Sequence, residues 1–400
     1  MIRITDPNVK VIIAGGSCWN TLGQIRSFGE AGVRPDLVWI RGDEFVPKGS
    51  KYVNHFKKVQ STEECLNYIL EHYTDRDCKY VISTDSDLLV SVMDQHYDQL
   101  KDRFIFFNAA EQGRLTKYMI KSAQCELAVL NGLDAPKSEL LTKGTLPGKL
   151  RYPIFTKTDN CFTRGWKTDY IICNNEQELL KAYESIKNDK LLLQEFIHKK
   201  NEVSLEGISI NQGEELYLPV QMDYLHLTDG KYGTWMTNYA YNLGDELKGK
   251  IQQILKTIHY SGIFELEFLE DMDGKLLFLE FNFRQTQLNH SMTDMGLNFC
   301  KIWAESMLNG RLCVDGAEIT KSPLIVMNER WDFQAGYKQK TIKNLMSWIS
   351  DIRKTDSFYI YNKKDKKPFF DFIWMLIRRR YYWLCYILKL KKKPINKSNQ

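Results

Sequence analysis

Two strand-like segments near residue 270 constrain the fold of this chain more than any other feature of its sequence. Residues 262–270 read GIFELEFLE, residues 275–281 read KLLFLEF, and the DMDG between them predicts a tight turn at Gly274. In a tight hairpin, Glu267 faces Glu280. Like charges directly opposite one another destabilise a sheet, so two carboxylates facing each other among Phe and Leu need a cation or a shared proton. The alternative interpretation is a half-exposed hairpin with ordinary surface charges.

The second strand continues with two more polar residues on the same face. The same register places Asn282 opposite Glu265, and Arg284 follows two residues later. One or two carboxylates with an amide oxygen suit Mg²⁺ that is shared with substrate phosphates, and an arginine on that face stabilises phosphate charge. The sequence therefore predicts a metal site at Glu267, Glu280 and Asn282. A register slip of one residue would reverse the faces.

Composition and charge restrict the class of protein. The 400 residues are 43% hydrophobic and 26% charged, which predicts two or three packed units. The net charge of +5 is small, and much of the Lys/Arg excess lies near the C-terminus, which argues against a nucleic-acid-binding body. Nine scattered cysteines without a CxxC pair predict a reduced chain with neither zinc nor disulfides. The N-terminus enters a strand pattern at once, so we expect no export signal and a cytoplasmic protein.

The pattern of elements changes along the chain. At first, short apolar runs alternate with helical patterns, which predicts an α/β unit with a parallel sheet covered by helices. We expect one helix from Arg114, ended by Gly132. From about residue 150, eight strand candidates with only two long helices predict an antiparallel α+β unit. The predicted domains are 1–110, 111–190, 191–330 and 331–400.

The C-terminal segment 369–393 has two aromatic-rich apolar runs separated by three arginines, Arg378 to Arg380. Each run is shorter than the roughly 20 residues that span a bilayer. Trp374 and Trp383 beside basic residues are typical of a segment that lies in a membrane interface. This interpretation predicts peripheral contact with the inner face of the plasma membrane. The alternative is a C-terminal helix packed on the body, with a basic solvated end.

Taken in order, these motifs resemble the ATP-grasp superfamily, whose signature is an acid on one strand followed by Glu-x-Asn-x-Arg on the next. The LEF at Glu267 and the LEFNFR from Leu279 match both halves. The resemblance implies a Rossmann-like N-terminal (pre-ATP-grasp) domain, followed by an ATP-grasp fold with a lid and an antiparallel-sheet subdomain. It implies ATP and Mg²⁺ as cofactors, with two magnesium ions at the site or Mn²⁺ in their place.

The resemblance also nominates residues that bind the nucleotide. Lys157 ends the strand YPIFTK, and Lys117 lies in LTKYMIKSA; both match phosphate-binding lysines, and Lys157 and Arg284 are the implied catalytic residues. The segment LLLQEFIHKKNEV resembles the linker that binds adenine and ribose, through Gln194, Glu195, Phe196, Ile197 and Glu202. The lid departs from the family, because its loop contains one glycine, Gly165, and Arg164 and Lys167 would have to supply charge in place of backbone donors.

Within the superfamily, the chain resembles the D-aspartate-ligase-like carboxylate–amine ligases of bacterial envelope synthesis. The likeness includes GGSCWNTLGQIRSFGEAG, LEFNFRQTQ…GLNF and the aromatic, basic C-terminus. It implies an ADP-forming ligase that makes an amide through an acyl phosphate, joining an amino acid to an envelope precursor or glycan. The acceptor candidates are Ser17, Gln285, Asn289 and His290, and the alternative for His290 is an ordinary loop histidine.

Two other functions remain open at this level. Asp85 and Asp87 in STDSD resemble the D-x-D metal motif of nucleotide-sugar glycosyltransferases, although short acidic motifs after strands are common by chance. The second alternative is a non-catalytic nucleotide-binding adaptor at the membrane. Binding of ATP would distinguish the ligase from the glycosyltransferase. Amino-acid-dependent release of ADP would distinguish the ligase from the non-catalytic adaptor.

Overall fold

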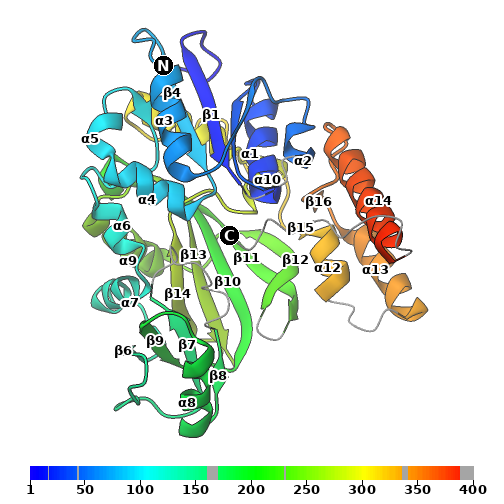
Figure 1. Cartoon of the computed structure of the whole chain (residues 1–400). Helices are drawn as coiled ribbons and strands as arrows, with labels where there is room; N and C mark the ends of the chain where they lie inside the picture. The colour runs from blue at the N-terminus through cyan, green and yellow to red at the C-terminus, as the bar shows by residue number, and fades with distance from the viewer. Residues whose placement is uncertain (17, 43–44, 160–169, 229–230, 336–340, 388–400) are drawn as a thin grey trace.

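The computed structural model describes residues 1–16, 18–42, 45–159, 170–228, 231–335 and 341–387. Ser17 and the lid residues Arg164, Gly165 and Lys167 lie outside the described residues, so what the sequence predicts for them stays a prediction. Over the described part, the strands form three sheets. In Figure 1 the N-terminal sheet lies at the top, the sheet that contains β10 to β14 lies in the middle, and the sheet of β6 to β9 lies at the bottom.

The N-terminal sheet is parallel throughout, in the order β3-β2-β1-β4-β5. Side chains that alternate along β1 bury against opposite layers: Ile13 packs in one core cluster with Ile25, and Ile12 packs in a second with Ile69. The predicted parallel sheet covered by helices is therefore confirmed. The strands are β1 (Val9–Gly15), β2 (Asp36–Ile40), β3 (Phe56–Val59), β4 (Lys79–Thr84) and β5 (Phe104–Ile105), and the helices are α1 (Cys18–Glu30), α2 (Phe45–Lys48), α3 (Thr62–His72), α4 (Asp87–Gln95) and α5 (Tyr97–Leu100).

The single helix expected from Arg114 is wrong. The structure has two helices, α6 (Arg114–Tyr118) and α7 (Lys121–Leu130), separated by an extended residue. The second helix begins at Lys121 because the Asp159 carbonyl accepts a hydrogen bond of 2.8 Å from the Lys121 N–H. Unsatisfied N–H groups at a helix start need such partners, and this one comes from a strand remote in sequence. The break brings Lys121 to a helix terminus.

A four-stranded antiparallel sheet with the order β6-β9-β7-β8 follows α7. Helix α8 (Glu176–Ser185) packs on it through buried residues that include Leu179 and Tyr183. The strands are β6 (Ser138–Thr142), β7 (Ile154–Thr158), β8 (Ile172–Cys173) and β9 (Lys190–Glu195). The domain boundary predicted at residue 190 falls on the first residue of β9, which pairs with β6 and β7.

The largest sheet has seven strands in the order β14-β13-β10-β11-β12-β15-β16. Its pairs are antiparallel apart from β15 and β16, so the predicted antiparallel unit is confirmed. The strands are β10 (Lys199–Ile210), β11 (Glu215–Thr228), β12 (Lys231–Ala240), β13 (Gly262–Asp271), β14 (Leu276–Asn282), β15 (Leu324–Met327) and β16 (Ser357–Phe358). The helices are α9 (Asp245–Ile258), α10 (Asn289–Asp294) and α11 (Phe299–Asn309).

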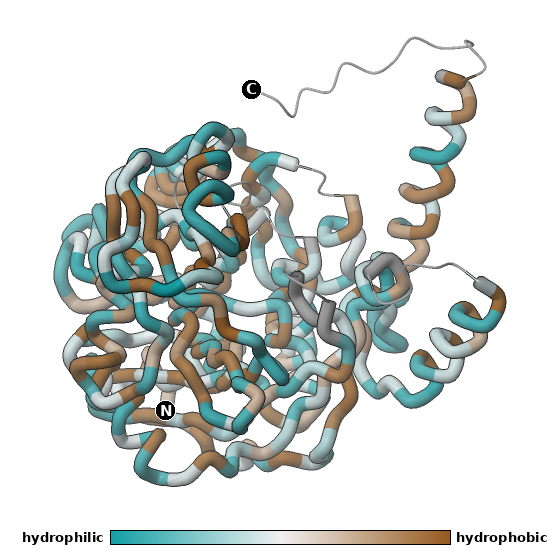
Figure 2. The backbone as a smooth tube through the Cα atoms, turned by 90° about the horizontal axis from the view of Figure 1, so that it is seen from below, coloured by the Kyte–Doolittle hydropathy of each residue, from teal (hydrophilic) through white to brown (hydrophobic). Residues whose placement is uncertain are grey.

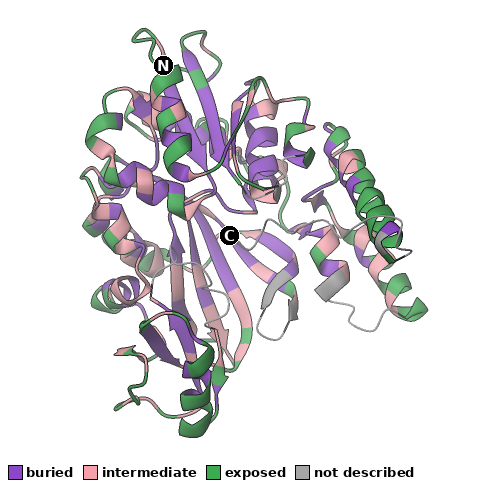
Figure 3. Ribbon diagram, viewed as in Figure 1, coloured by how far each residue is buried: buried purple, intermediate pink, exposed green. Residues whose placement is uncertain are grey.

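The C-terminal extension contributes α12 (Glu329–Ala335), α13 (Ile342–Lys354) and α14 (Lys367–Ile387), with β16 between the last two. Figure 2 shows α14 projecting beyond the main body. Figure 3 shows that much of its surface is exposed. In the part of the chain that the structure describes, no helix is long and apolar enough to cross a membrane.

Glu329, the first residue of α12, binds the segment between β16 and α14. Its burial leads to a prediction about the pH dependence of stability. Its carboxylate accepts hydrogen bonds from the backbone N–H groups of Ile360 (3.2 Å) and Tyr361 (2.9 Å), and burial raises its pKa from 4.5 to about 7. A carboxyl with a raised pKa favours the folded state at a pH below 4.5, and this contribution is lost as the pH rises through about 7.

We therefore expect wild type to lose up to about 3 kcal/mol relative to Glu329→Gln as the pH rises from 4.5 to 8. Thermal unfolding of both proteins at a series of pH values measures the difference. A difference that stays constant over this range would contradict the prediction.

Candidate active site

The hairpin at the edge of the seven-stranded sheet has the predicted register at its polar residues, while a register shift between Glu267 and Phe268 changes the pairing nearer the turn. Glu265 pairs with Asn282 and Glu267 pairs with Glu280 across β13 and β14, and Gly274 in the turn has a φ of +83°. The Asn282 Nδ2 donates to both facing carboxylates, at 3.1 Å from Glu265 Oε2 and 3.3 Å from Glu267 Oε1. The predicted residues of the metal site therefore lie together on one face.

A further carboxylate on the adjacent strand was not identified from the sequence. Glu206 on β10 pairs with Glu265, is 1% exposed, and accepts a hydrogen bond of 3.0 Å from Thr286 Oγ1. Alternation along EVSLEGISI does place Ser204 and Glu206 on one face of a strand. The missing information was which strand lies next to β13, because β10 and β13 are far apart in sequence.

The three buried glutamates of this face ionise less readily than glutamates in water. Burial, and then the Glu206 charge, raise the pKa of Glu265 to about 8. Burial and the charges of Glu265 and Glu280 raise the pKa of Glu267 well above its usual range. Burial also raises the pKa of Glu206 to about 8. An added cation at this face would lower all three values, since it favours the ionised forms.

Lys121 supplies the positive charge nearest to Glu280. It lies at the start of α7, and its ammonium forms an ion pair with the Glu280 carboxylate. Burial alone would raise the pKa of Glu280, but Lys121, and then Lys157, hold it below its usual value. The sequence nominated Lys117 for this place. Lys117 is instead exposed in the last turn of α6, with its Nζ 5.5 Å from the Tyr118 ring centroid.

Lys157 lies where the sequence predicts it, on β7 of the four-stranded sheet. It is 7% exposed, and burial and the charge of Lys121 lower its pKa to about 8. The attraction of Glu280 acts in the opposite direction. Two lysines thus come from different elements to one acidic face. A polyanion such as a triphosphate would relieve their mutual repulsion.

Arg284 follows β14 and connects Asn282 on the hairpin with Asp87 at the start of α4. Its Nε lies 2.9 Å from Asp87 Oδ1, and it donates at 3.2 Å to Asn282 Oδ1. Burial would lower its pKa, but the charges of Asp87 and Glu265 raise it overall, so the guanidinium stays charged. Asp85 is engaged as well, because its Oδ2 accepts from Thr21 Oγ1 at 2.6 Å. The D-x-D pair is therefore bonded within this protein, one residue to Arg284 and the other to α1.

The segment nominated for adenine and ribose runs from β9 of the four-stranded sheet to β10 of the seven-stranded sheet. Gln194 is buried on β9, while the Glu195 carboxylate accepts from the Lys137 N–H at 2.8 Å. The Phe196 N–H donates to the Pro153 carbonyl at 3.0 Å. This N–H, which was expected to contact adenine, therefore already has a partner within the protein. Glu202 forms an ion pair with Lys199. Ile197 directly follows Phe196.

Gln285 and Asn289, which the sequence nominates for the acceptor pocket, are buried in this structure. Gln285 Nε2 donates to Ser83 Oγ at 3.2 Å, which links the end of β14 to β4. Asn289 Nδ2 donates to the Asn20 carbonyl at 3.2 Å, and a Cβ on Gly23 would lie 2.7 Å from Asn289 Oδ1. Asn289 therefore mediates the close packing of α10 on α1.

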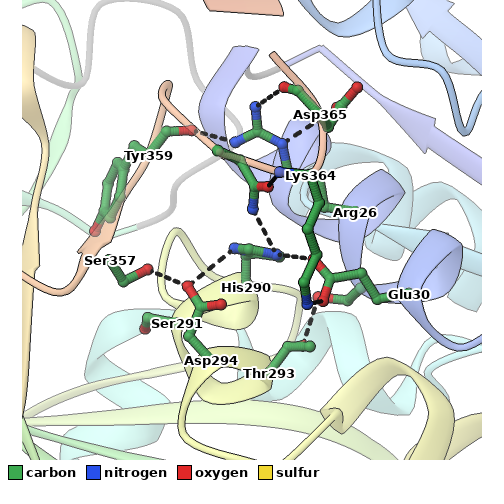
Figure 4. A network of polar contacts seen from close by, with 12 residues as sticks. Arg26, Glu30, His290, Ser291, Thr293, Asp294, Ser357, Tyr359, Lys364 and Asp365 are labelled. Atoms are coloured by element: carbon green, nitrogen blue, oxygen red, sulfur yellow. Dashed lines mark hydrogen bonds and ion pairs between the residues drawn. The ribbon is translucent and has the colours of Figure 1, made fainter.

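His290 is the clearest correction among the acceptor candidates. Its Nε2 lies 3.0 Å from Glu30 Oε1 and its Nδ1 lies 3.5 Å from Asp294 Oδ2, with only 6% of the residue exposed (Figure 4). Burial would raise the pKa of Glu30, but hydrogen bonds from His290 and Lys364 lower it to about 2. His290 is thus part of a buried ionic network between α1, α10 and the C-terminal extension.

The face around Glu267 and Glu280 fits a magnesium ion shared with phosphates. Among the described residues, no three His, Cys, Asp or Glu side chains form a metal cluster by themselves. Mg²⁺ usually takes one or two carboxylates and receives its other oxygens from water and substrate phosphates. Two facing glutamates, the adjacent Asn282 amide and the raised pKa of Glu267 match this requirement.

The chain is similar to several curated proteins, although no protein-family model matches it. It is 23% identical to D-aspartate ligase of Enterococcus faecium over 320 residues, which cover 72% of this chain and 75% of that protein. It is 22% identical to N5-carboxyaminoimidazole ribonucleotide synthase of Staphylococcus epidermidis over 324 residues, covering 75% and 82%.

Solved structures resemble the fold over most of its length. N5-carboxyaminoimidazole synthetase from Staphylococcus aureus gives a TM-score of 0.63 at 16% identity, covering 84% of this chain and 86% of that one. L-amino acid ligase from Bacillus licheniformis gives 0.61 at 14% identity, covering 79% and 78%. These neighbours are ATP-grasp enzymes, and this chain has the ATP-grasp fold. It is a ligase, related in sequence to D-aspartate ligase and N5-carboxyaminoimidazole ribonucleotide synthase.

Proposed function

We propose that this protein is an ADP-forming carboxylate–amine ligase that joins an amino acid to a cell-envelope precursor or glycan. A substrate carboxylate attacks the γ-phosphorus of ATP, which forms an acyl phosphate and releases ADP. The amine then attacks the acyl carbon, phosphate leaves, and the nitrogen loses a proton to form the amide. The similarity to D-aspartate ligase supports the choice of an amino acid.

The cationic residues of the site have distinct parts in this mechanism. Lys157 and Lys121 neutralise phosphate oxygens from the β7 and α7 sides, and Arg284 binds the transferring phosphoryl group or the substrate carboxylate beside it. Phosphoryl transfer needs this positioning and charge stabilisation rather than covalent chemistry from the protein. Lys121 takes the place that the sequence had given to Lys117.

We infer that Glu267, Glu280 and Asn282 hold Mg²⁺, which would offset charge on the phosphate oxygens when bound. Glu265 and Glu206 lie beside these residues on the same face of the sheet, and a bound cation would favour their ionised forms. Structures of the fold neighbours N5-carboxyaminoimidazole synthase and synthetase contain ATP or ADP, which supports ATP as the nucleotide.

For the nucleotide base, we infer that Gln194, Glu195, Phe196 and Ile197 contact adenine and that Glu202 contacts the ribose. We expect adenine to bond the carbonyl of Phe196 rather than its N–H, because the N–H already donates to the Pro153 carbonyl. The acceptor lies next to Arg284 and the turn after β1. Asp85 follows β4 and contacts this turn through hydrogen bonds with Thr21 and Gly16. Burial raises the pKa of Asp85 to about 6. The parallel β3-β2-β1-β4-β5 order also supports a Rossmann-like N-terminal domain.

The observation that carries the proposal is the convergence of Lys121 and Lys157 on the Glu267–Glu280 pair. Three different elements, α7, β7 and the β13–β14 hairpin, supply these four side chains. One buried and one partly buried lysine beside facing carboxylates match a polyphosphate with its metal ion. A glycosyltransferase site at Asp85 and Asp87 would instead need both aspartates available to a metal.

An ADP-release screen with Mg²⁺-ATP tests the proposal. Each L- and D-amino acid is added with and without extracted envelope precursors, and ADP and phosphate are measured together. We expect one or a few amino acids to stimulate equal release of both products, and omission of Mg²⁺ to abolish it. Binding of a uridine-diphosphate sugar without binding of ATP would contradict the ligase and favour the glycosyltransferase.

A further inference from the structure

The outward side of α14 carries a row of exposed apolar and aromatic side chains, here called the outer stripe. Its members are 38–62% exposed, and they recur at helical spacing over most of the length of α14. The outer stripe consists of Phe370, Ile373, Trp374, Ile377 and Leu384. Apolar residues at this spacing lie on one side of a helix, and on α14 the side chains of this side are exposed.

The opposite side of α14 is the one that holds the helix on the body. Pro368, Phe372 and Met375 are buried, and the first part of the helix packs against α2. At 100° per residue, these three positions point roughly opposite to Phe370 and Ile377. The packing of α14 on its own protein therefore does not use the outer stripe. The stripe needs a different explanation.

Basic residues border the outer stripe on both sides. Arg378 and Arg380 project to opposite flanks of the stripe at helical spacing, and Arg380 Cζ lies 4.5 Å above the Trp383 ring. Arginines that flank an apolar stripe contact phosphate headgroups while their neighbours enter the acyl region, and Trp and Tyr favour the boundary between the two. We propose that the outer stripe of α14 docks on an anionic lipid bilayer, with the helix parallel to the membrane plane.

Charge favours a bilayer over a second copy of the chain. In a symmetric dimer through the outer stripe, the arginines of one copy would meet those of the other, because a two-fold interface pairs the same surface with itself. Anionic headgroups instead attract each basic residue near the surface. Three consecutive arginines in the middle of α14 also place a large charge at the centre of the helix, which disfavours insertion across the bilayer.

A second helix shows the same pattern at this end of the molecule (Figure 1). On α13, Ile342, Leu345 and Met346 are 83%, 44% and 62% exposed, with the i, i+3, i+4 spacing of one helical side. Lys343 lies beside them. Two exposed amphipathic helices increase the apolar area that can enter a membrane surface, and interfacial binding increases with that area.

Flotation of the full-length protein with lipid vesicles tests this proposal. We expect it to float with vesicles of equal parts phosphatidylglycerol and phosphatidylcholine, and to bind vesicles of phosphatidylcholine alone roughly tenfold more weakly or less. Arg378→Glu/Arg380→Glu and Trp374→Ser/Ile377→Ser should each reduce binding to the anionic vesicles about tenfold or more. ADP release in solution should not change, since neither pair belongs to the active site.

Matched controls change the same properties elsewhere on the surface. Lys10→Glu/Lys301→Glu alters charge equally, and Leu130→Ser/Met272→Ser removes two exposed apolar side chains far from α14 in the sequence. Both controls should bind vesicles like wild type. Equal binding by the stripe variants and wild type would overturn the proposal. A wild-type dimer that the stripe variants dissociate, without vesicle binding, would overturn it in favour of a second copy.

Discussion

Replacing Lys121 by alanine is expected to lower kcat for amino-acid-dependent ADP release roughly a hundredfold or more. Lys121 pairs with Glu280 and lies close enough to Lys157 to affect its pKa, so its ammonium belongs to the acidic face where phosphates would bind. Removing it takes away charge stabilisation of the phosphoryl group. The measurement is steady-state ADP release, with kcat and the KM for ATP determined separately.

Lys117→Ala is the matched control, since it removes the same side chain four residues earlier in the chain. Lys117 is exposed beside Tyr118, so the rate should stay within about twofold of wild type. Glu280→Gln should reduce kcat as Lys121→Ala does, while circular dichroism shows an unchanged fold. Equal losses in Lys117→Ala and Lys121→Ala would show that the structure assigns the wrong lysine.

The hairpin could be predicted from sequence because its information is local. Alternation fixes which residues share a face, and Gly274 fixes the turn, so the facing of Glu267 and Glu280 follows from residues within a short segment. Lys157 was nominated by the resemblance to the ATP-grasp superfamily, through the strand YPIFTK that it ends. The alternating strand–helix pattern likewise sufficed for the parallel sheet.

Lys121 could not be predicted because the helix break depends on a distant partner. Periodicity runs through residues 119 and 120 without interruption, while the bond that starts α7 comes from Asp159 on the far side of β7. Glu206 was missed because strand order decides its neighbour, and strand order is a property of the whole fold. His290 looked like a ligand residue because Glu30, its partner, is 260 positions away. A local sequence pattern does not show which remote segments will bury a residue.

The contact of His290 with Glu30 lies where the C-terminal extension meets α1. Arg26 on α1 is 1% exposed, and it donates to the carbonyls of Tyr359 (3.1 Å) and Ile360 (2.8 Å) and to Asp365 Oδ2 (3.3 Å). Asp365 Oδ2 also accepts from Ser50 Oγ at 2.7 Å. Burial lowers the pKa of Arg26, while Asp365 raises it. One guanidinium therefore fixes the segment that leads into α14.

Replacing Arg26 by methionine is expected to destabilise this junction by about 3–5 kcal/mol. The change leaves the Asp365 carboxylate buried without its cation and leaves two backbone carbonyls without their donor, and both losses are costly in an interior. Native-state hydrogen exchange of the Tyr359 and Ile360 amides measures the local opening free energy. The thermal unfolding midpoint of the whole chain measures the global effect.

Lys101→Ala provides the control for this ion pair. Lys101 and Asp98 lie 2.6 Å apart with side chains 42% and 63% exposed, so its loss should cost less than about 1 kcal/mol. The double variant Arg26→Met/Asp365→Leu should recover part of the loss, because no unpaired charge remains buried. If Arg26→Met costs no more than Lys101→Ala, the Arg26 contacts do not hold the extension. In a separate test, flotation of Arg26→Met shows whether α14 still binds vesicles when its attachment to the body is weakened. We expect this variant to bind at least as well as wild type.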